Sequence, residues 1–203
     1  EEIEEVKSEL ADLEKFRALA QRIRKNSKAE QLFTALERGF TALESLGANQ
    51  KALIFTESRR TQDFICNLLE ARGYADKVVK FNGSNADQKS KEIYAAYLKK
   101  HKGTDILTGS LTADKRAAIV DYFKDEATIM VATEAAAEGI NLQFCSLVIN
   151  FDLPWNPQRI EQRIGRCHRY GQKYDVVVIN FLNKANAADQ RVYELLDWIG
   201  RAK

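Results

Sequence analysis

The chain has 203 residues, of which 45% are hydrophobic and 30% charged, and its net charge is +2. This composition is ordinary for a globular protein and excludes a bulk polycation, so any nucleic-acid binding must come from a local basic surface. No apolar run approaches the ~18 residues of a bilayer-spanning helix and no signal peptide is visible, so we expect a cytoplasmic protein without membrane contact.

The cysteines indicate reduced thiols rather than a metal centre. Cys66, Cys145 and Cys167 lack the spacing of metal ligands, and their number is odd, so no metal site is expected. The sequence opens with Glu1 in the middle of a helical pattern, from which we expect a fragment of a longer protein.

Two amphipathic helices are predicted in the first 48 residues. Apolar residues recur at spacings of three and four over Glu1–Arg24, including Ile3, Val6, Leu10, Leu13 and Phe16. This helix is interpreted as a connecting helix packed on its own domain or on a neighbour, with a coiled coil as the alternative. A second helix is predicted over about Lys28–Leu46, ended by Gly47.

Strands and helices then alternate. Short apolar runs predict strands over residues 52–56, 77–81, 105–108, 129–133, 147–151 and 175–181. Helical patterns predict helices after Ser58 and Arg59 up to Gly73, over 85–101, from a Thr112 cap to Phe123, and over 186–199. This alternation predicts a three-layer α/β domain with a mostly parallel sheet, whose ligands gather at the carboxyl ends of the strands.

A helix rich in arginine is predicted between Pro157 and Tyr170, because Asn156 is a good N-cap and Gly171 a good C-terminal residue. On such a helix Arg166 and Arg169 point the same way, one turn apart. Two parallel guanidinium groups suit a polyphosphate, whereas a solvated basic face is the alternative interpretation.

The segment QRIGRCHRYGQ at 162–172, preceded by EGINLQ and DLPWNP, resembles motifs V and VI of superfamily-two helicases. In detail it is similar to the SWI/SNF-type branch of these DEAD/DEAH-like proteins, and we expect a bacterial member. The resemblance covers roughly Lys51–Phe181. The sequence contains neither a G-x-x-x-x-G-K-[ST] loop nor an Asp-Glu pair placed after a strand.

The resemblance explains this gap, because such helicases have two RecA-like (P-loop NTPase-like) lobes and the first carries the phosphate loop. The chain then corresponds to the second lobe. We expect a helical lead-in over 1–48 and the lobe over 49–203. An insertion is expected at about 84–110, between the turn at Asn82–Gly83 and the helix Lys115–Phe123 that resembles the family's next helix.

Site residues follow from the resemblance, position by position. Arg166 and Arg169 correspond to the arginine fingers that meet the γ-phosphate when the lobes close. The remaining residues expected at the site contact the nucleotide, namely Gln162, Gly139 and Asn141, or the nucleic-acid backbone, namely Thr133, Ser58 and Arg59. For Thr133 and Ser58 the alternative is a strand-end hydroxyl that caps the next helix. Trp155 is expected to pack rather than to stack on a base.

The implied function is that of the C-terminal lobe of an ATP-dependent helicase or translocase. ATP and Mg2+ would bind mainly to the N-terminal lobe of the same chain, and the nucleic acid would be DNA, double-stranded by preference, or RNA. The segment by itself is expected to be inactive. The alternative is a non-catalytic RecA-like interaction module that docks a partner protein through Glu1–Arg24.

Overall fold

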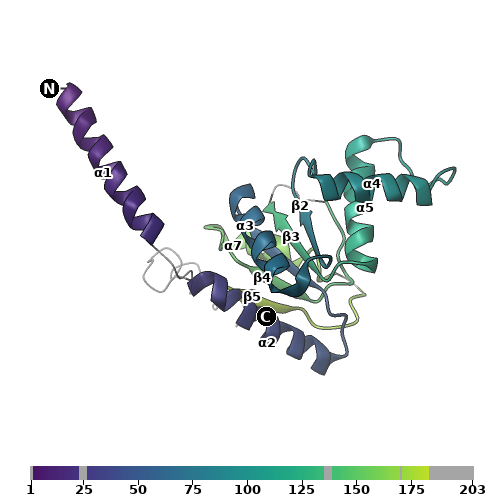
Figure 1. The fold of residues 1–203 in the computed structure, drawn as a ribbon. Coiled ribbons are helices and arrows are strands. Elements are labelled where there is room, and N and C mark those ends of the chain that lie inside the picture. Colours follow the sequence, from purple (N-terminus) through teal and green to yellow (C-terminus); the bar gives the residue numbers. More distant parts are fainter. Residues whose placement is uncertain (1, 23–26, 135–138, 170, 183–203) are drawn as a thin grey trace.

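The computed structural model describes residues 2–22, 27–134, 139–169 and 171–182. Within these ranges helices surround one five-stranded sheet (Figure 1). The strands are β1 (Ala52–Thr56), β2 (Val78–Phe81), β3 (Ile129–Thr133), β4 (Leu147–Asn150) and β5 (Val177–Asn180). The helices are α1 (Glu2–Arg22), α2 (Ser27–Leu46), α3 (Arg59–Leu69), α4 (Gln88–Lys100), α5 (Leu111–Asp125) and α7 (Pro157–Ile164), with a π-helical turn, η1 (Glu70–Tyr74), after α3.

The sheet is parallel throughout, in the order β2-β3-β1-β4-β5. The central strands are buried along their whole length, which is why their sequences are continuously apolar instead of alternating. Thr56 pairs in register with Thr133, and Asn150 pairs with Asn180, so the strands end together at one edge. That edge is where parallel α/β sheets place their ligands.

Helices cover both faces of the sheet and make the predicted three-layer α/β fold. On one face α2 and α3 pack against alternate strand residues through Leu32, Leu36, Leu43, Ile65 and Leu69. On the other face α4 and α5 contribute Ile93, Tyr97, Ala118, Ile119 and Phe123, joined by the segment from Ile140 to Cys145. Alternation of strand side chains between these two clusters fixes the register of each strand, because a slip by one residue would exchange the faces.

Helix boundaries depend on a few local contacts. Gly47 has φ +67° and ends α2 as predicted, with the amide of Ala48 donating to the carbonyl of Leu43.

The strand predicted over 105–108 does not form, because that stretch is a turn held by Asp114. The Asp114 carboxylate accepts hydrogen bonds from the amide (2.9 Å) and hydroxyl (2.8 Å) of Thr108. The helix begins at Leu111, so Thr112 is not its cap.

The helix α1 projects away from the rest of the described chain (Figure 1). None of the helices described is long and apolar enough to cross a bilayer. The helix predicted over 186–199 lies outside the described residues.

Candidate nucleotide and nucleic-acid site

The carboxyl edge of the sheet carries a row of polar side chains that the strands themselves position. Thr133, Thr56, Asn150 and Asn180 end β3, β1, β4 and β5, which are neighbours in that order. Nδ2 of Asn150 donates to Oδ1 of Asn180 at 2.8 Å. The loops that carry the predicted motifs leave the sheet from this edge.

The helix α7 starts as the sequence predicts and ends earlier. Oδ1 of Asn156 accepts a hydrogen bond from the amide of Gln158 at 2.9 Å, and Pro157 occupies the first turn. The helix ends at Ile164, with Gly165 as its C-terminal cap. The predicted continuation to Tyr170 is therefore wrong, and Arg166 and Arg169 do not lie one turn apart on one helix.

After Ile164 the helix tightens into a turn, in which the amides of Arg166 and Cys167 donate to the carbonyls three residues before them. The carbonyl of Arg166 accepts a hydrogen bond from the amide of Leu142 at 2.9 Å, a contact between the two motif segments. Cys167 is fully buried in the core cluster on the α4–α5 face of the sheet. A Cβ on Gly165 would lie 3.2 Å from the carbonyl of Glu161, which is tighter than an ordinary contact, so glycine suits this bend.

The two predicted finger arginines remain available to a ligand. Arg166 is half-buried and Arg169 is exposed. Neither side chain has an ion pair or hydrogen bond to another described residue. The backbone bond between Leu142 and Arg166 brings the arginine segment beside Gly139 and Asn141, which are both exposed. The structure thus brings together the predicted nucleotide-side residues of the two motifs, and Gln162 is exposed on α7.

A third arginine, which the sequence analysis did not single out, anchors the motif. Arg163 is only 3% exposed, and its Nη1 donates to Oδ1 of Asn150 and to the carbonyl of Asp152, both at 2.9 Å. Its Nη2 lies 3.3 Å from a carboxylate oxygen of Glu134, and its guanidinium lies 4.9 Å from the ring centre of Phe55. Burial lowers the pKa of Arg163, and the charge of Glu134 offsets part of that effect.

Arg163 therefore ties α7 to the ends of β4 and β3. Glu134 follows β3 directly and also pairs with Arg159 at 3.1 Å, on the exposed side of α7. Arg159 thus has a local carboxylate partner, unlike Arg166 and Arg169 among the described residues. A sequence signal for Arg163 existed, since it follows the buried Ile160 by three residues and so lies on the apolar side of the helix.

Asp152 is a second anchor at the same edge. Its carboxylate accepts hydrogen bonds from the hydroxyl of Thr56 (2.6 Å), the amide of Glu57 (3.1 Å) and Nζ of Lys28 (2.9 Å). Burial of the carboxyl group works to raise the pKa of Asp152, but these hydrogen bonds outweigh burial and the pKa is lowered. The contact with Lys28 fastens the start of α2 to the loop after β4.

The predicted nucleic-acid residues lie near one another at the ends of β1 and β3. The hydroxyl of Ser58 accepts a hydrogen bond from the amide of Thr61 at 3.0 Å, so the capping role proposed for Ser58 is present. Arg59 is exposed, whereas Thr133 is only 7% exposed. The packing predicted for Trp155 is wrong, because this residue is 77% exposed in the loop before α7.

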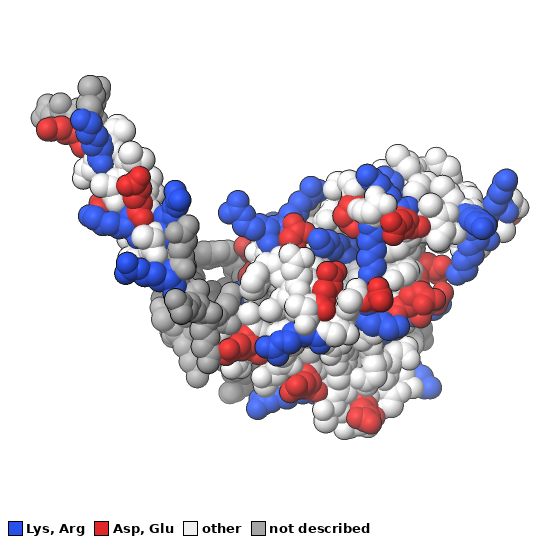
Figure 2. Space-filling view, viewed as in Figure 1, with Lys and Arg blue, Asp and Glu red and all other residues white. Residues whose placement is uncertain are grey.

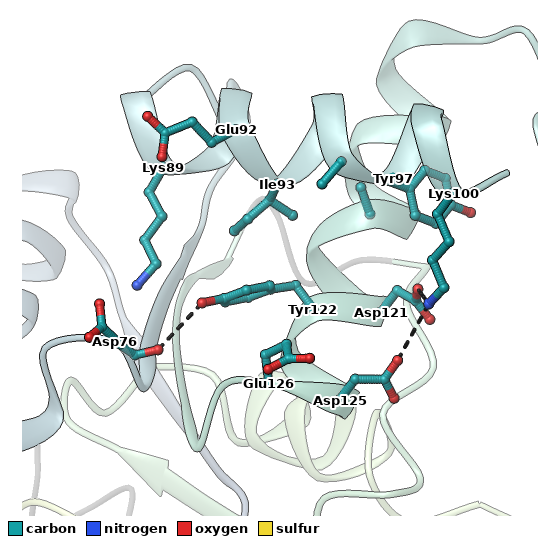
Figure 3. A pocket seen from close by; sticks show the side chains of 12 residues that line it. Asp76, Lys89, Glu92, Ile93, Tyr97, Lys100, Asp121, Tyr122, Asp125 and Glu126 are labelled. Carbon is teal, nitrogen blue, oxygen red and sulfur yellow. Dashed lines mark hydrogen bonds and ion pairs between the residues drawn. The ribbon is translucent and has the colours of Figure 1, made fainter. Parts of the chain in front are cut away.

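Two cavities lie beside α5. One of about 580 Å3 lies between α5 and the segment of Gly139 and Asn141. Another, of about 460 Å3, lies between α4 and α5, where acidic side chains such as Asp121 and Asp125 surround Tyr122 (Figure 3). Lys100 is ion-paired with both of those aspartates, at 3.0 and 3.6 Å, so its charge is neutralised locally. None of the predicted motif residues lines this second cavity.

Metal ligands do not cluster in the described ranges, where no group of three His, Cys, Asp or Glu side chains could hold an ion. Cys66, Cys145 and Cys167 are free and buried, and burial raises the pKa of Cys66 to about 12.

Comparison with known proteins identifies the domain. Residues 27–171 match the family model described as the helicase conserved C-terminal domain. The ATP-dependent helicase YqhH of Bacillus subtilis (strain 168), described as uncharacterized, is 33% identical over 86% of the chain and 24% of its own length. The RNA polymerase-associated protein RapA of Vibrio cholerae (strain M66-2) is 38% identical over 43% of the chain and 9% of its own length. The chain thus spans a quarter or less of these curated relatives.

Two solved structures share the fold. The C-terminal part of the Fun30 ATPase domain has a TM-score of 0.59 and 21% sequence identity, over 84% of this chain and 45% of that one. The C-terminal domain of the DEAD-box protein Dbp5 has a TM-score of 0.50 and 20% identity, over 82% of this chain and 79% of that one.

Proposed function

Because the chain belongs to the helicase conserved C-terminal domain family, as the second RecA-like lobe of a SWI/SNF-type superfamily-two protein, we propose that it supplies arginine fingers to an ATPase site between two lobes. The full-length protein would then be an ATP-dependent translocase or helicase. The first lobe, which would carry the phosphate loop, is its expected partner within the same chain.

The observation that carries this proposal is that the side chains of the two predicted finger arginines are unpaired among the described residues. Arg166 and Arg169 follow a short helix whose other arginines are already engaged, Arg163 in a buried network and Arg159 with Glu134. The fingers themselves have no partner among the described residues. Guanidinium groups held at a sheet edge without a carboxylate partner suit the oxygens of a triphosphate.

The chain's own residues would act in three ways. Arg166 and Arg169 would balance the negative charge that develops on the transferred phosphoryl group. Gln162 and the segment of Gly139 and Asn141 would position the nucleotide from the same side. ATP and Mg2+ fit this arrangement as ligands held mainly by the other lobe, and they supply the phosphoryl group and its charge neutralisation.

Nucleic-acid contact is assigned to the neighbouring strand ends. Ser58 and Arg59 are exposed at the start of α3, where backbone amides and a guanidinium group suit a phosphate backbone. Thr133 would contribute from the end of β3, although little of it is exposed. Double-stranded DNA is the favoured ligand because of the SWI/SNF-type motif.

The proposal is tested by ATP turnover of the full-length protein with and without single-stranded or double-stranded DNA. We expect turnover that DNA stimulates, most strongly when double-stranded, and none from the 203-residue chain alone. Stimulation should fall in an Arg59→Ala variant and persist in Lys124→Ala, which changes an exposed lysine at the far end of α5. An intact protein that does not hydrolyse ATP under any of these conditions would contradict the proposal.

A further inference from the structure

The groove between α4 and α5 combines an apolar lining with an acidic rim, and the proposed ATPase role makes no use of it. Its volume of about 460 Å3 is that of an ordinary ligand pocket. The helix α4 lines it with Ile93, Ala96 and Tyr97, and α5 lines it with Ala118 and Tyr122. Aliphatic and aromatic side chains therefore offer packing surface to a ligand that enters between the two helices.

Acidic residues outnumber basic ones around this groove, although the whole chain has a net charge of +2. The two lysines of the lining are already engaged. Nζ of Lys89 donates to the carbonyl of Val78 at 2.9 Å. Lys100 pairs with Asp121 and Asp125. Red and blue side chains are interspersed over the face of the molecule in Figure 2, so the acidic excess belongs to the groove and not to the surface as a whole.

Tyr122 lies among the acidic groups of the groove, and Figure 3 shows its ring between Asp76 on one side and Asp121 on the other. The Tyr122 hydroxyl donates to the backbone carbonyl of Asp76 at 3.3 Å. The carboxylates of Asp76 and Glu126 have no ion pair or hydrogen bond within the described part of the chain. Lys77 reaches only the backbone carbonyl of Glu126, at 3.3 Å. Burial raises the pKa of Tyr122, and the charges of Glu126 and Asp76 add to that effect, so both carboxylates act on the ring.

Two unpaired carboxylates beside a half-buried aromatic ring favour a cation, because the ring face and the carboxylates attract positive charge together. We propose that the groove binds a lysine or arginine side chain on an extended segment of a partner protein. The cationic group lies against Tyr122 and pairs with Asp76 and Glu126. Its aliphatic stem packs on the apolar lining that includes Ile93.

The chain's own Lys100 shows that the groove accepts an ammonium group, since it pairs with Asp121 and Asp125 beside Tyr97 (Figure 3). Because Lys100 already neutralises those two aspartates, a single further cation suits the groove. A free polyamine would bring a second ammonium group toward Lys100, whereas one basic side chain would not. The inference uses no residue of the sheet edge and stands independently of the proposed ATPase role.

The test is the fluorescence anisotropy of a short fluorescein-labelled peptide of alternating lysine and alanine, titrated with the 203-residue chain. We expect saturable binding, which acetylation of the peptide's lysines abolishes. Spermidine should displace the labelled peptide less well than the unlabelled peptide does. The absence of binding, or displacement by spermidine at the same concentration as by the unlabelled peptide, would overturn the proposal.

Charge variants locate the binding in the groove. Asp76→Asn/Glu126→Gln removes both unpaired carboxylates and should raise the Kd of the peptide about tenfold. The matched control is Glu37→Gln/Glu44→Gln, which removes two exposed carboxylates from α2 and should bind as the original chain does. Equal weakening in the two variants would show general attraction to acidic surface and would refute binding in the groove.

Two more variants test the aromatic ring and the resident lysine. Tyr122→Phe keeps the ring and should bind as the original chain does, whereas Tyr122→Leu should raise the Kd about threefold. Lys100→Ala frees Asp121 and Asp125 and should lower the Kd about threefold. A Kd unchanged by Tyr122→Leu, or not lowered by Lys100→Ala, would contradict the proposed contacts. Circular dichroism of each variant confirms that the domain is folded.

Discussion

Replacing Arg163 should destabilise the domain far more than replacing its exposed neighbour Arg159. Both arginines contact the carboxylate of Glu134, at 3.3 and 3.1 Å, but their side chains are 3% and 57% exposed respectively. Arg163 also donates two hydrogen bonds of 2.9 Å, to Asn150 and to the carbonyl of Asp152. Arg163→Ala would leave the buried side-chain oxygen of Asn150 and the partly buried carbonyl of Asp152 without this donor, and buried unpaired groups are costly.

The magnitude follows from these contacts. Removing one member of a buried ion pair costs ~3–5 kcal/mol, and the lower end applies because Glu134 keeps Arg159 and some contact with water. We therefore expect Arg163→Ala to lower the free energy of unfolding by about 3 kcal/mol. For a chain of this size that corresponds to a Tm lower by roughly 6–12 °C. Arg159→Ala should lower the free energy of unfolding by less than about 1 kcal/mol, because an exposed ion pair contributes no more than that.

The assay is urea unfolding of the 203-residue chain, followed by circular dichroism, with Arg159→Ala as the matched control. Equal, small losses in the two variants would refute the view that Arg163 anchors the motif. A loss confined to Arg163→Ala supports it.

Two further outcomes are expected. Because the folded pKa of Asp152 is below its ordinary value of 3.8, its contribution to stability is present above about pH 4 and is lost as pH falls through the folded pKa. The difference in unfolding free energy between the original chain and Asp152→Asn should therefore shrink in acid, and a pH-independent difference would contradict this. Gly39→Ala should lower the free energy of unfolding by ~1–3 kcal/mol, because the added Cβ would lie 2.5 Å from a methyl group of Leu147 in the core. Denaturant titration measures this loss. Gly83→Ala is the control, since its Cβ would meet nothing within 4 Å, and equal stability of the two variants would exclude overpacking.

The sheet was predictable from the sequence because buried parallel strands are short and continuously apolar. The strands Ala52–Thr56 and Ile129–Thr133 form over the predicted residues. The predicted strand at 105–108 failed because its residues turn around Asp114, a contact that hydrophobic periodicity does not reveal.

The resemblance supplies the candidate site residues, and the sequence predicts their geometry only in part. The motif names Arg166 and Arg169, but local rules extended α7 through them, because no local rule includes the hydrogen bond between Leu142 and Arg166. Trp155 was assigned to packing because no second aromatic residue flanks it to form a stacking platform, and the loop leaves it exposed. In each case a contact between distant segments, or the lack of one, decided the outcome.

The central claim is that Arg166 and Arg169 act on the phosphates of ATP, and the most direct test is ATP turnover of the full-length protein with either arginine changed to alanine. Arginine fingers contribute ~10³–10⁵ in rate, so each variant should lose nearly all turnover while its Tm stays that of the original. Arg38→Ala, an exposed arginine on α2, should hydrolyse ATP at the original rate. Full turnover in Arg166→Ala and Arg169→Ala would contradict the account.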